Sequence, residues 1–217
     1  MTPVLPADLL DWDAKFLEKA RALYPVSDPA HDLLHIRRVV ENACRLAREE
    51  GADLYIVLPA AYFHDFVTVP KNDTRRSVAS RLSAVAAIEY LGSIGYPEKY
   101  FDGIRHAIEA HSFSANISPG TIEAKVVQDA DRLDANGAIG IARCFAVNAQ
   151  IQTAFYDPDD FLHERRDADD GKFAVDHFFI KLFKLPEMMN TASARAEGER
   201  RVVFMKEFLK ELQREVS

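Results

Sequence analysis

The chain has 217 residues, of which 48% are hydrophobic and 28% are charged. This composition is typical of a globular protein and excludes the disordered, collagen-like and low-complexity classes. The formal net charge of -7 argues against a broad basic face for duplex nucleic acid. No apolar stretch reaches the ~18 residues of a membrane span, and the start of the chain lacks the pattern of a signal peptide. We therefore expect a cytoplasmic protein that does not act at a membrane.

Apolar residues recur with helical spacing along nearly the whole chain. The pattern predicts helices at 7–23, 32–50, 54–66, 75–94, 97–112, 120–135, 137–150, 172–185 and 192–215. No run alternates strongly enough to predict a strand, so the expected fold class is all-α. The stretch 151–171 has weak periodicity and high charge, and we expect a long loop or lid there. Cys44 and Cys144 lie inside the helical patterns and are expected to be small buried side chains.

Histidine side chains fall on or beside the apolar faces of two predicted helices. His35 lies one turn before Val39 and borders the apolar face of its helix. His64 follows Val57 at the seven-residue spacing of one helix face, so it is expected to point inward, with Asp65 beside it.

Aspartates occupy the corresponding stripe of a third predicted helix. Asp131 and Asp134 share a face with Val127, whereas Asp129 falls off that face and is expected to be solvated. An ionised aspartate on an apolar stripe is costly unless it is paired or bound to a cation. Inward histidines and aspartates can offset this cost around one divalent ion, and such ligands suit Mn, Fe, Co, Ni, Zn or hydrated Mg. The alternative is a set of hydrogen-bonded core histidines and capping or ion-paired aspartates, and the residues alone leave both interpretations open.

The order of these motifs resembles the H…HD…D signature of the HD-domain metal-dependent phosphohydrolase superfamily. The match is closest to a branch of bacterial HD proteins described as predicted hydrolases, and it extends over about residues 28–212. The matching segments are AHDLLHIRRV, YFHDF, IRHAIEAHSFSA, VVQDADRLDANGAIGIARCFA and HFFIKLFKLPEMMNT. The resemblance implies a single-domain HD-type helical bundle. We expect an N-terminal helical extension at 1–27 and, at 28–217, the HD bundle with C-terminal packing helices.

The resemblance also implies four ligands for one divalent metal ion, which is Mn, Mg, Ni, Co, Zn or Fe. Two neighbouring residues compete for these roles. His31 also begins an HD dipeptide, but it precedes its helix, and the HxxRV pattern favours His35. Asp134 shares the face of Asp131, but the ADRL register favours Asp131. Asn136 stands where this branch leads us to expect an apolar residue. The implied ligands are His35, His64, Asp65 and Asp131.

Residues near these ligands are candidates for phosphate binding and proton transfer. A group of basic and amide side chains follows the HD dipeptide and suits phosphate contacts. The alternative is that these side chains are solvated at the protein surface. The group comprises Lys71, Asn72, Arg76 and Arg81. His106 and His111 are five residues apart on one helix. Both are candidates for a second metal, for phosphate contact or for a general acid, and the alternative for them is a packing role. Glu109 and Asp134 are candidate partners of the ligand histidines. We expect Asp65, His111, Lys71 and Arg76 to be catalytic.

The implied reaction is attack on phosphorus by a metal-activated water. We expect a nucleoside triphosphate to be cleaved to the monophosphate and pyrophosphate. The nearest alternative is a 5′-nucleotidase that uses the same site. Alternatives of other classes are a diiron oxygenase and a non-catalytic nucleotide-binding module. The expected partner is a small nucleotide or phosphoester, and the chain is expected to be a monomer or a homodimer.

Overall fold

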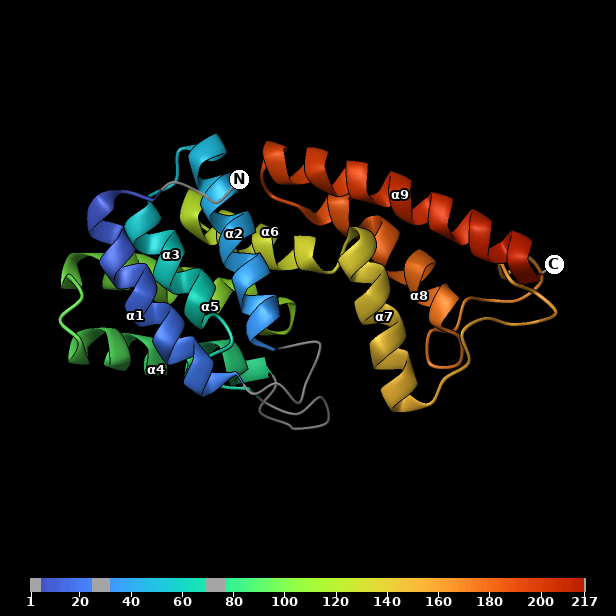
Figure 1. Ribbon diagram of the computed structural model, residues 1–217, viewed down its shortest axis with the longest axis horizontal. Coiled ribbons are helices and arrows are strands. Elements are labelled where there is room, and N and C mark those ends of the chain that lie inside the picture. Colours follow the sequence, from blue (N-terminus) through green and yellow to red (C-terminus); the bar gives the residue numbers. More distant parts are fainter. Residues whose placement is uncertain (1–4, 25–31, 69–76, 217) are drawn as a thin grey trace. The chain divides into compact units, whose positions relative to one another are not determined.

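The computed structural model describes residues 5–24, 32–68 and 77–216, and over these residues the chain is helical with connecting loops (Figure 1). The α-helices are α1 (Ala7–Leu23), α2 (Leu33–Glu50), α3 (Leu54–Phe63), α4 (Ala79–Ser93), α5 (Phe101–His111), α6 (Ile122–Asp134), α7 (Gly137–Ile151), α8 (Ala174–Ile180) and α9 (Ala192–Val216). Short 3-10 segments are η2 (Glu98–Tyr100), η3 (Phe113–Ala115) and η4 (Leu182–Met188). Within the described part no helix is both long and apolar enough to cross a membrane.

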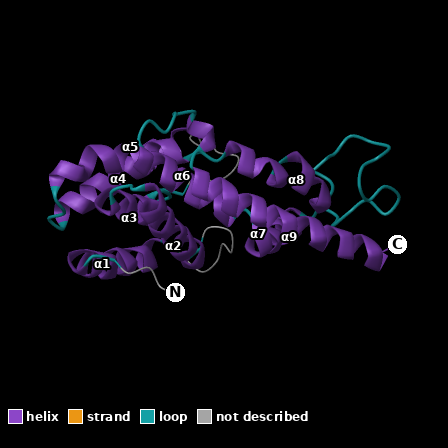
Figure 2. Cartoon of the chain, turned by 90° about the horizontal axis from the view of Figure 1, so that it is seen from above, coloured by secondary structure: helices purple, strands orange, loops and turns teal. Residues whose placement is uncertain are grey.

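The all-α prediction is confirmed. Figure 2 draws no strand in the described residues, where the only β pairing is an isolated bridge between Ala154 and Phe173. Most predicted helices agree with the observed ones to within a few residues. The helix predicted at 172–185 is divided, because the backbone leaves the helical region at Lys181 and Pro186 lies in a 3-10 segment. The predicted loop at 151–171 corresponds to the non-helical stretch between α7 and α8.

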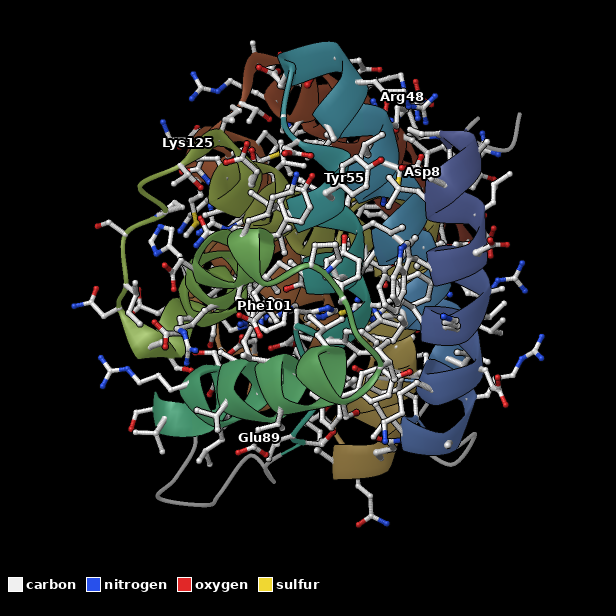
Figure 3. All side chains as sticks on the ribbon, turned by 90° about the vertical axis from the view of Figure 1, so that its left-hand side faces the viewer. Asp8, Arg48, Tyr55, Glu89, Phe101 and Lys125 are labelled. Carbon is white, nitrogen blue, oxygen red and sulfur yellow. The ribbon has the colours of Figure 1, made fainter. Side chains whose placement is uncertain are left out.

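The chain divides into two compact units, which we call unit 1 (Met1–Asp131) and unit 2 (Arg132–Ser217). The helix of the predicted N-terminal extension, α1, packs against α2 and α3 inside unit 1. Tyr55 of α3 donates a hydrogen bond to Asp8 of α1 at the surface of this unit (Figure 3). The division of the chain at residue 27 stays a prediction.

Helix α3 is the centre of unit 1, because it packs against α1, α2, α4 and α5. Its sequence, LYIVLPAAYF, is apolar on every side, which is typical of a helix that is covered all round. Asp53 caps its first turn by accepting a hydrogen bond from the Tyr55 N–H at 2.8 Å. The far end of α3 places His64 in the interior of the unit and leaves Asp65 beside it half-buried.

Helix α2 carries the first candidate ligand on its buried face. Asp32 caps it by accepting a hydrogen bond from the His35 N–H at 2.8 Å. Gly51 ends it with a φ of 74°, a left-handed conformation that glycine adopts without strain. Because Ile36 and Val39 on the same face are buried, the His35 side chain also faces inward.

In unit 2, α9 packs against α7 and η4. Val202, Met205 and Leu209 of α9 are buried, so this face lies against the unit's own core, as the predicted packing role requires. Gly140 of α7 allows a close approach of the backbone, because a Cβ at this position would lie 2.4 Å from the Ala135 carbonyl oxygen. Cys144 is buried in this unit, and Cys44 is buried in unit 1.

The loop between α7 and α8 is tied together around one arginine. Arg166 donates to both carboxylate oxygens of Asp176, at 2.5 and 3.0 Å, and to Asp157 at 2.9 Å. The Asp176 side chain has no exposed area, and it also accepts the Asp169 N–H at 2.6 Å. The guanidinium lies over the Phe173 ring. The ionised Asp176, in the first turn of α8, is therefore compensated by the loop that precedes this helix.

Candidate metal centre

Four elements of unit 1 bring histidine and aspartate side chains together. His35 comes from the first turns of α2, and His64 and Asp65 follow the end of α3. His111 is the last residue of α5, and Asp131 lies near the end of the described helix α6. Each residue lies at the end of a helix or on its apolar face. The packing of several helices against one another therefore brings the cluster together, rather than the course of one loop.

His64 has a fixed ring orientation and a nitrogen available to a metal. Its Nδ1 lies 2.9 Å from the Ala61 carbonyl oxygen, and because a carbonyl only accepts, the ring proton is on Nδ1. Its Nε2 is buried without a hydrogen-bond partner, 3.5 Å from Asp65 Oδ2 and 3.9 Å from Asp131 Oδ1. A nitrogen lone pair thus faces two carboxylate oxygens. This arrangement fits a bound cation, which would satisfy all three acceptors.

Two overlapping groups of side chains have ligand atoms close enough to share an ion. In each group the atoms lie within 4.8 Å of one another, and His64 belongs to both. The first group is His35, His64 and Asp131, and the second is His64, Asp65 and His111. His35 Nε2 lies 3.6 Å from Asp131 Oδ1, and His111 Nε2 lies 3.4 Å from Asp65 Oδ1. Imidazole and carboxylate ligands suit divalent first-row metals.

The electrostatics of the cluster favour the protonation states that bind metal. Burial acts to raise the pKa of Asp65, but His64 and His111 outweigh it and hold the pKa below its ordinary value. Burial likewise acts to raise the pKa of Asp131, and His64 and His35 reverse this. Burial lowers the pKa of His64, which keeps its ring neutral. Ionised carboxylates beside a neutral imidazole are the ligand forms that a metal requires.

His111 differs from His64 in the direction in which its pKa is shifted. Burial acts to lower its pKa, but the hydrogen bond and the charge of Asp65 raise the pKa above its ordinary value. Its Nδ1 lies 2.7 Å from the Ile108 carbonyl oxygen, which fixes the ring against its own helix. His111 can therefore carry a proton beside Asp65, whose side chain is 31% exposed and reachable from solvent.

The structure does not bring every predicted site residue to this cluster. His106 belongs to neither ligand group, and its Nε2 accepts a hydrogen bond from the Gly120 N–H at 2.9 Å. Arg81 is exposed on α4. The other predicted phosphate contacts, and the competing HD histidine, lie outside the described residues. They are Lys71, Asn72, Arg76 and His31.

Helix α6 and the turn after it contain buried polar residues. The expectation that Asp129 is solvated is wrong, because residues 126–130 are all buried, so this part of the helix is covered on every side. Asp134 forms an ion pair with Arg143 at 2.8 Å. Asn136, at the expected apolar position, is 1% exposed.

Two buried polar residues beside the cluster were missed by the sequence analysis. Ser80 Oγ on α4 donates to the Glu109 carbonyl at 3.0 Å, and Gln128 Nε2 on α6 donates to the Ala110 carbonyl at 2.7 Å. Both bonds end on the backbone of α5, just before His111. The only signal in the sequence is that Gln128 lies three residues before Asp131, on the same helix face.

Comparisons with known proteins point to one family. The model of the HD domain matches residues 33–136. An uncharacterized Bacillus subtilis protein, YpgQ, is 37% identical over 190 residues, which cover 86% of this chain and 84% of the relative.

Solved structures of bacterial proteins have the same fold. The crystal structure of B. subtilis YpgQ in complex with ADP has a TM-score of 0.74 and 35% identity, and the match covers 95% of each chain. An HD-superfamily hydrolase from Bacillus thuringiensis has a TM-score of 0.73 and 31% identity, over 95% of this chain and 97% of that one.

Proposed function

Since the chain belongs to the HD-domain family, we propose that it is a metal-dependent phosphohydrolase that cleaves a nucleoside triphosphate to the monophosphate and pyrophosphate. The observation that carries the proposal is the approach of His64 Nε2 to Asp65 and Asp131 in the interior of unit 1. The ADP complex of the similar protein YpgQ supports a nucleotide as the substrate class.

The candidate ligands divide the work of the site. His35, His64, Asp65 and Asp131 would hold one divalent ion, which when bound supplies Lewis acidity and lowers the pKa of a coordinated water. Asp65 accepts the proton of the attacking water at a carboxylate oxygen. His111, which faces Asp65 at 3.4 Å, donates a hydrogen bond or a proton to the phosphate oxygens. Lys71 and Arg76 stabilise the remaining phosphate charge.

The test is a product screen with metal-free protein. Mn, Mg, Ni or Zn is added back singly, and nucleoside triphosphates, monophosphates and cyclic phosphates are offered. Phosphate and pyrophosphate are measured separately. Asp131→Asn removes a ligand charge, and Asp102→Asn is the matched control, because Asp102 is exposed in the first turn of α5. Pyrophosphate from triphosphates, lost in Asp131→Asn and kept in Asp102→Asn, is the expected result.

Other products would identify the alternatives. Phosphate released from monophosphates would make the protein a 5′-nucleotidase with the same site. Tight nucleotide binding without product in any metal would indicate a nucleotide-binding module.

One observation favours a second candidate function, a diiron oxygenase. Asp65 and His111 of the second ligand group offer ligands for a second ion, whereas the single available nitrogen of His64 can serve only one of the two ions. Two equivalents of iron per chain and substrate-dependent oxygen uptake would support this function. One equivalent of metal with pyrophosphate release and no oxygen uptake would exclude it.

A further inference from the structure

The last turn of α5 is held by side chains rather than left to solvent. The final carbonyl groups of a helix have no partner within the helix. In α5, three of them accept hydrogen bonds from buried side chains of unit 1. The Ile108 carbonyl pairs with His111 Nδ1 at 2.7 Å, the Glu109 carbonyl with Ser80 Oγ at 3.0 Å, and the Ala110 carbonyl with Gln128 Nε2 at 2.7 Å. The helix end that carries His111 is therefore fixed from α4, from α6 and by His111 itself.

Gln128 connects two parts of the candidate metal centre. It is 5% exposed and lies three residues before Asp131 on α6, so both side chains project from the same face of that helix. Its amide reaches the carbonyl of the residue next to His111. Helix α6 therefore supplies Asp131 and also holds the end of α5 that places His111 against Asp65.

Loss of this bond has a definite structural consequence. Without the Gln128 amide, the Ala110 carbonyl would be buried without a donor, which is costly. The last turn of α5 would therefore shift so that this carbonyl reaches another partner. The His111 ring depends on that turn, because its Nδ1 bonds the Ile108 carbonyl one turn earlier. A displaced ring no longer faces Asp65 at the 3.4 Å seen here.

We propose that Gln128 is a positioning residue for the phosphohydrolase reaction, which holds His111 against Asp65 through the Ala110 carbonyl. The inference rests on the proposed function for its kinetic consequence, but the position of His111 is measurable without turnover. Supporting residues of this kind typically change activity by about 10–100-fold.

The variants separate loss of the donor from loss of shape. Gln128→Met keeps the length of the side chain and removes the donor. Gln128→Glu keeps the shape, and as a buried acid facing a carbonyl it is protonated and can still donate. Asn148→Leu is the matched control, because Asn148 is also 5% exposed and its Nδ2 donates to the Cys144 carbonyl at 2.8 Å in unit 2.

The kinetic test is a double-mutant cycle with His111→Gln. In the wild-type background, Gln128→Met is expected to lower kcat about tenfold with KM changed by less than about twofold. Gln128→Glu is expected to keep most of the wild-type kcat. Asn148→Leu is expected to lower the free energy of unfolding and to leave kcat unchanged. In the His111→Gln background, Gln128→Met is expected to have no further effect on kcat. An equal loss in both backgrounds would overturn the proposal and leave Gln128 a structural residue.

The second readout does not need activity. Nuclear Overhauser contacts between the His111 ring and the Asp65 side chain are expected in the wild type and in Gln128→Glu, and are expected to weaken in Gln128→Met. Unchanged contacts in Gln128→Met would overturn the inference. A wild-type protein that shows the contacts but releases no product would refute the proposed function and leave the positioning role intact.

Discussion

Acidic side chains of the interior in unit 2, and the half-buried acids of the candidate metal centre in unit 1, meet different partners. In unit 2, Asp134 is paired with Arg143 at 2.8 Å, and Asp176 is held by Arg166 at 2.5 and 3.0 Å. In unit 1, Asp65 and Asp131 face histidine nitrogens at 3.4 to 3.9 Å, which is long for a hydrogen bond.

The difference separates a structural charge pair from a site that can take a ligand. A guanidinium is always protonated and fills the space beside a carboxylate with donors. An imidazole can instead present a lone pair, and His64 does so. In the unit 2 pairs the charge of each carboxylate is balanced by a guanidinium. In the unit 1 cluster, the His64 nitrogen and the carboxylates of Asp65 and Asp131 face one another, and a bound cation would balance their charge.

The largest effect is expected from removing the lone pair shared by both ligand groups. His64→Gln should lower bound metal and kcat/KM by more than the ~100-fold that outer-shell changes cause. Metal content after gel filtration and steady-state kinetics measure the two effects. His177→Gln is the control, because His177 pairs with Asp170 at 2.8 Å in unit 2 and should leave the metal content unchanged. Full metal content in His64→Gln would refute the assignment.

The next largest effect is expected from opening the charge pair of the unit 2 loop. Arg166→Ala leaves Asp176 buried without its counter-charge, so the free energy of unfolding should fall by about 3 kcal/mol. Urea unfolding measures this change, and limited proteolysis should cut the loop faster. Arg165→Ala is the neighbouring control, because its guanidinium donates to an exposed carbonyl, that of Asp159. Equal stability of the two variants would contradict the role of Arg166.

Metal addition should stabilise the wild-type protein through unit 1. A ligand at a hundred times its dissociation constant adds about 2.7 kcal/mol to the free energy of unfolding. Thermal unfolding with and without Mn should show this increase, and Asp131→Asn should lose most of it. A metal-induced increase that survives in both Asp131→Asn and His64→Gln would place the metal elsewhere.

A smaller, pH-dependent effect is expected in unit 2. Hydrogen bonds from Arg200 and Arg201 lower the pKa of Glu197 from 4.5 to about 2. Because the folded pKa is the lower one, this pairing stabilises fully above pH 4.5, and its contribution is lost as the pH falls from 4.5 toward 2. Glu197→Gln should therefore flatten the acid side of the stability profile measured by urea unfolding. An unchanged profile would show that the pairing contributes nothing.

The smallest effect is expected from an exposed pair in unit 1. Arg45 and Glu49 meet at 3.1 Å on α2, with side chains 38% and 43% exposed. Arg45→Ala should change the free energy of unfolding by less than about 0.5 kcal/mol, because water and salt screen such pairs. A loss as large as that of Arg166→Ala would mean that burial does not explain the contrast between the units.

Helical periodicity was sufficient to predict the fold and the inward direction of His64. The ends of α2 carry clear signals, Asp32 and Gly51, and α3 is apolar throughout, so local pattern and final burial agree. The approach of His35, His64 and Asp131 required the family resemblance, because spacing on separate helices does not tell which faces meet.

Where the prediction failed, contacts distant in sequence decide the outcome. Asp129 is buried because α6 is covered on more than one face, which a single-helix pattern does not reveal. The bond from Gln128 to the Ala110 carbonyl depends on where one helix end docks against another. Arg166 and Asp176 meet through a loop without periodicity, so their pairing could not be inferred from spacing.

The order of the candidate ligands along the chain matters for biosynthesis. Unit 1 ends at Asp131, which is also the last of these ligands to leave the ribosome. Domains fold as units during translation, beginning at the N-terminus. A nascent chain from which unit 1 has emerged therefore possesses every candidate ligand, so the proposed ion would bind before residues 132–217 are complete.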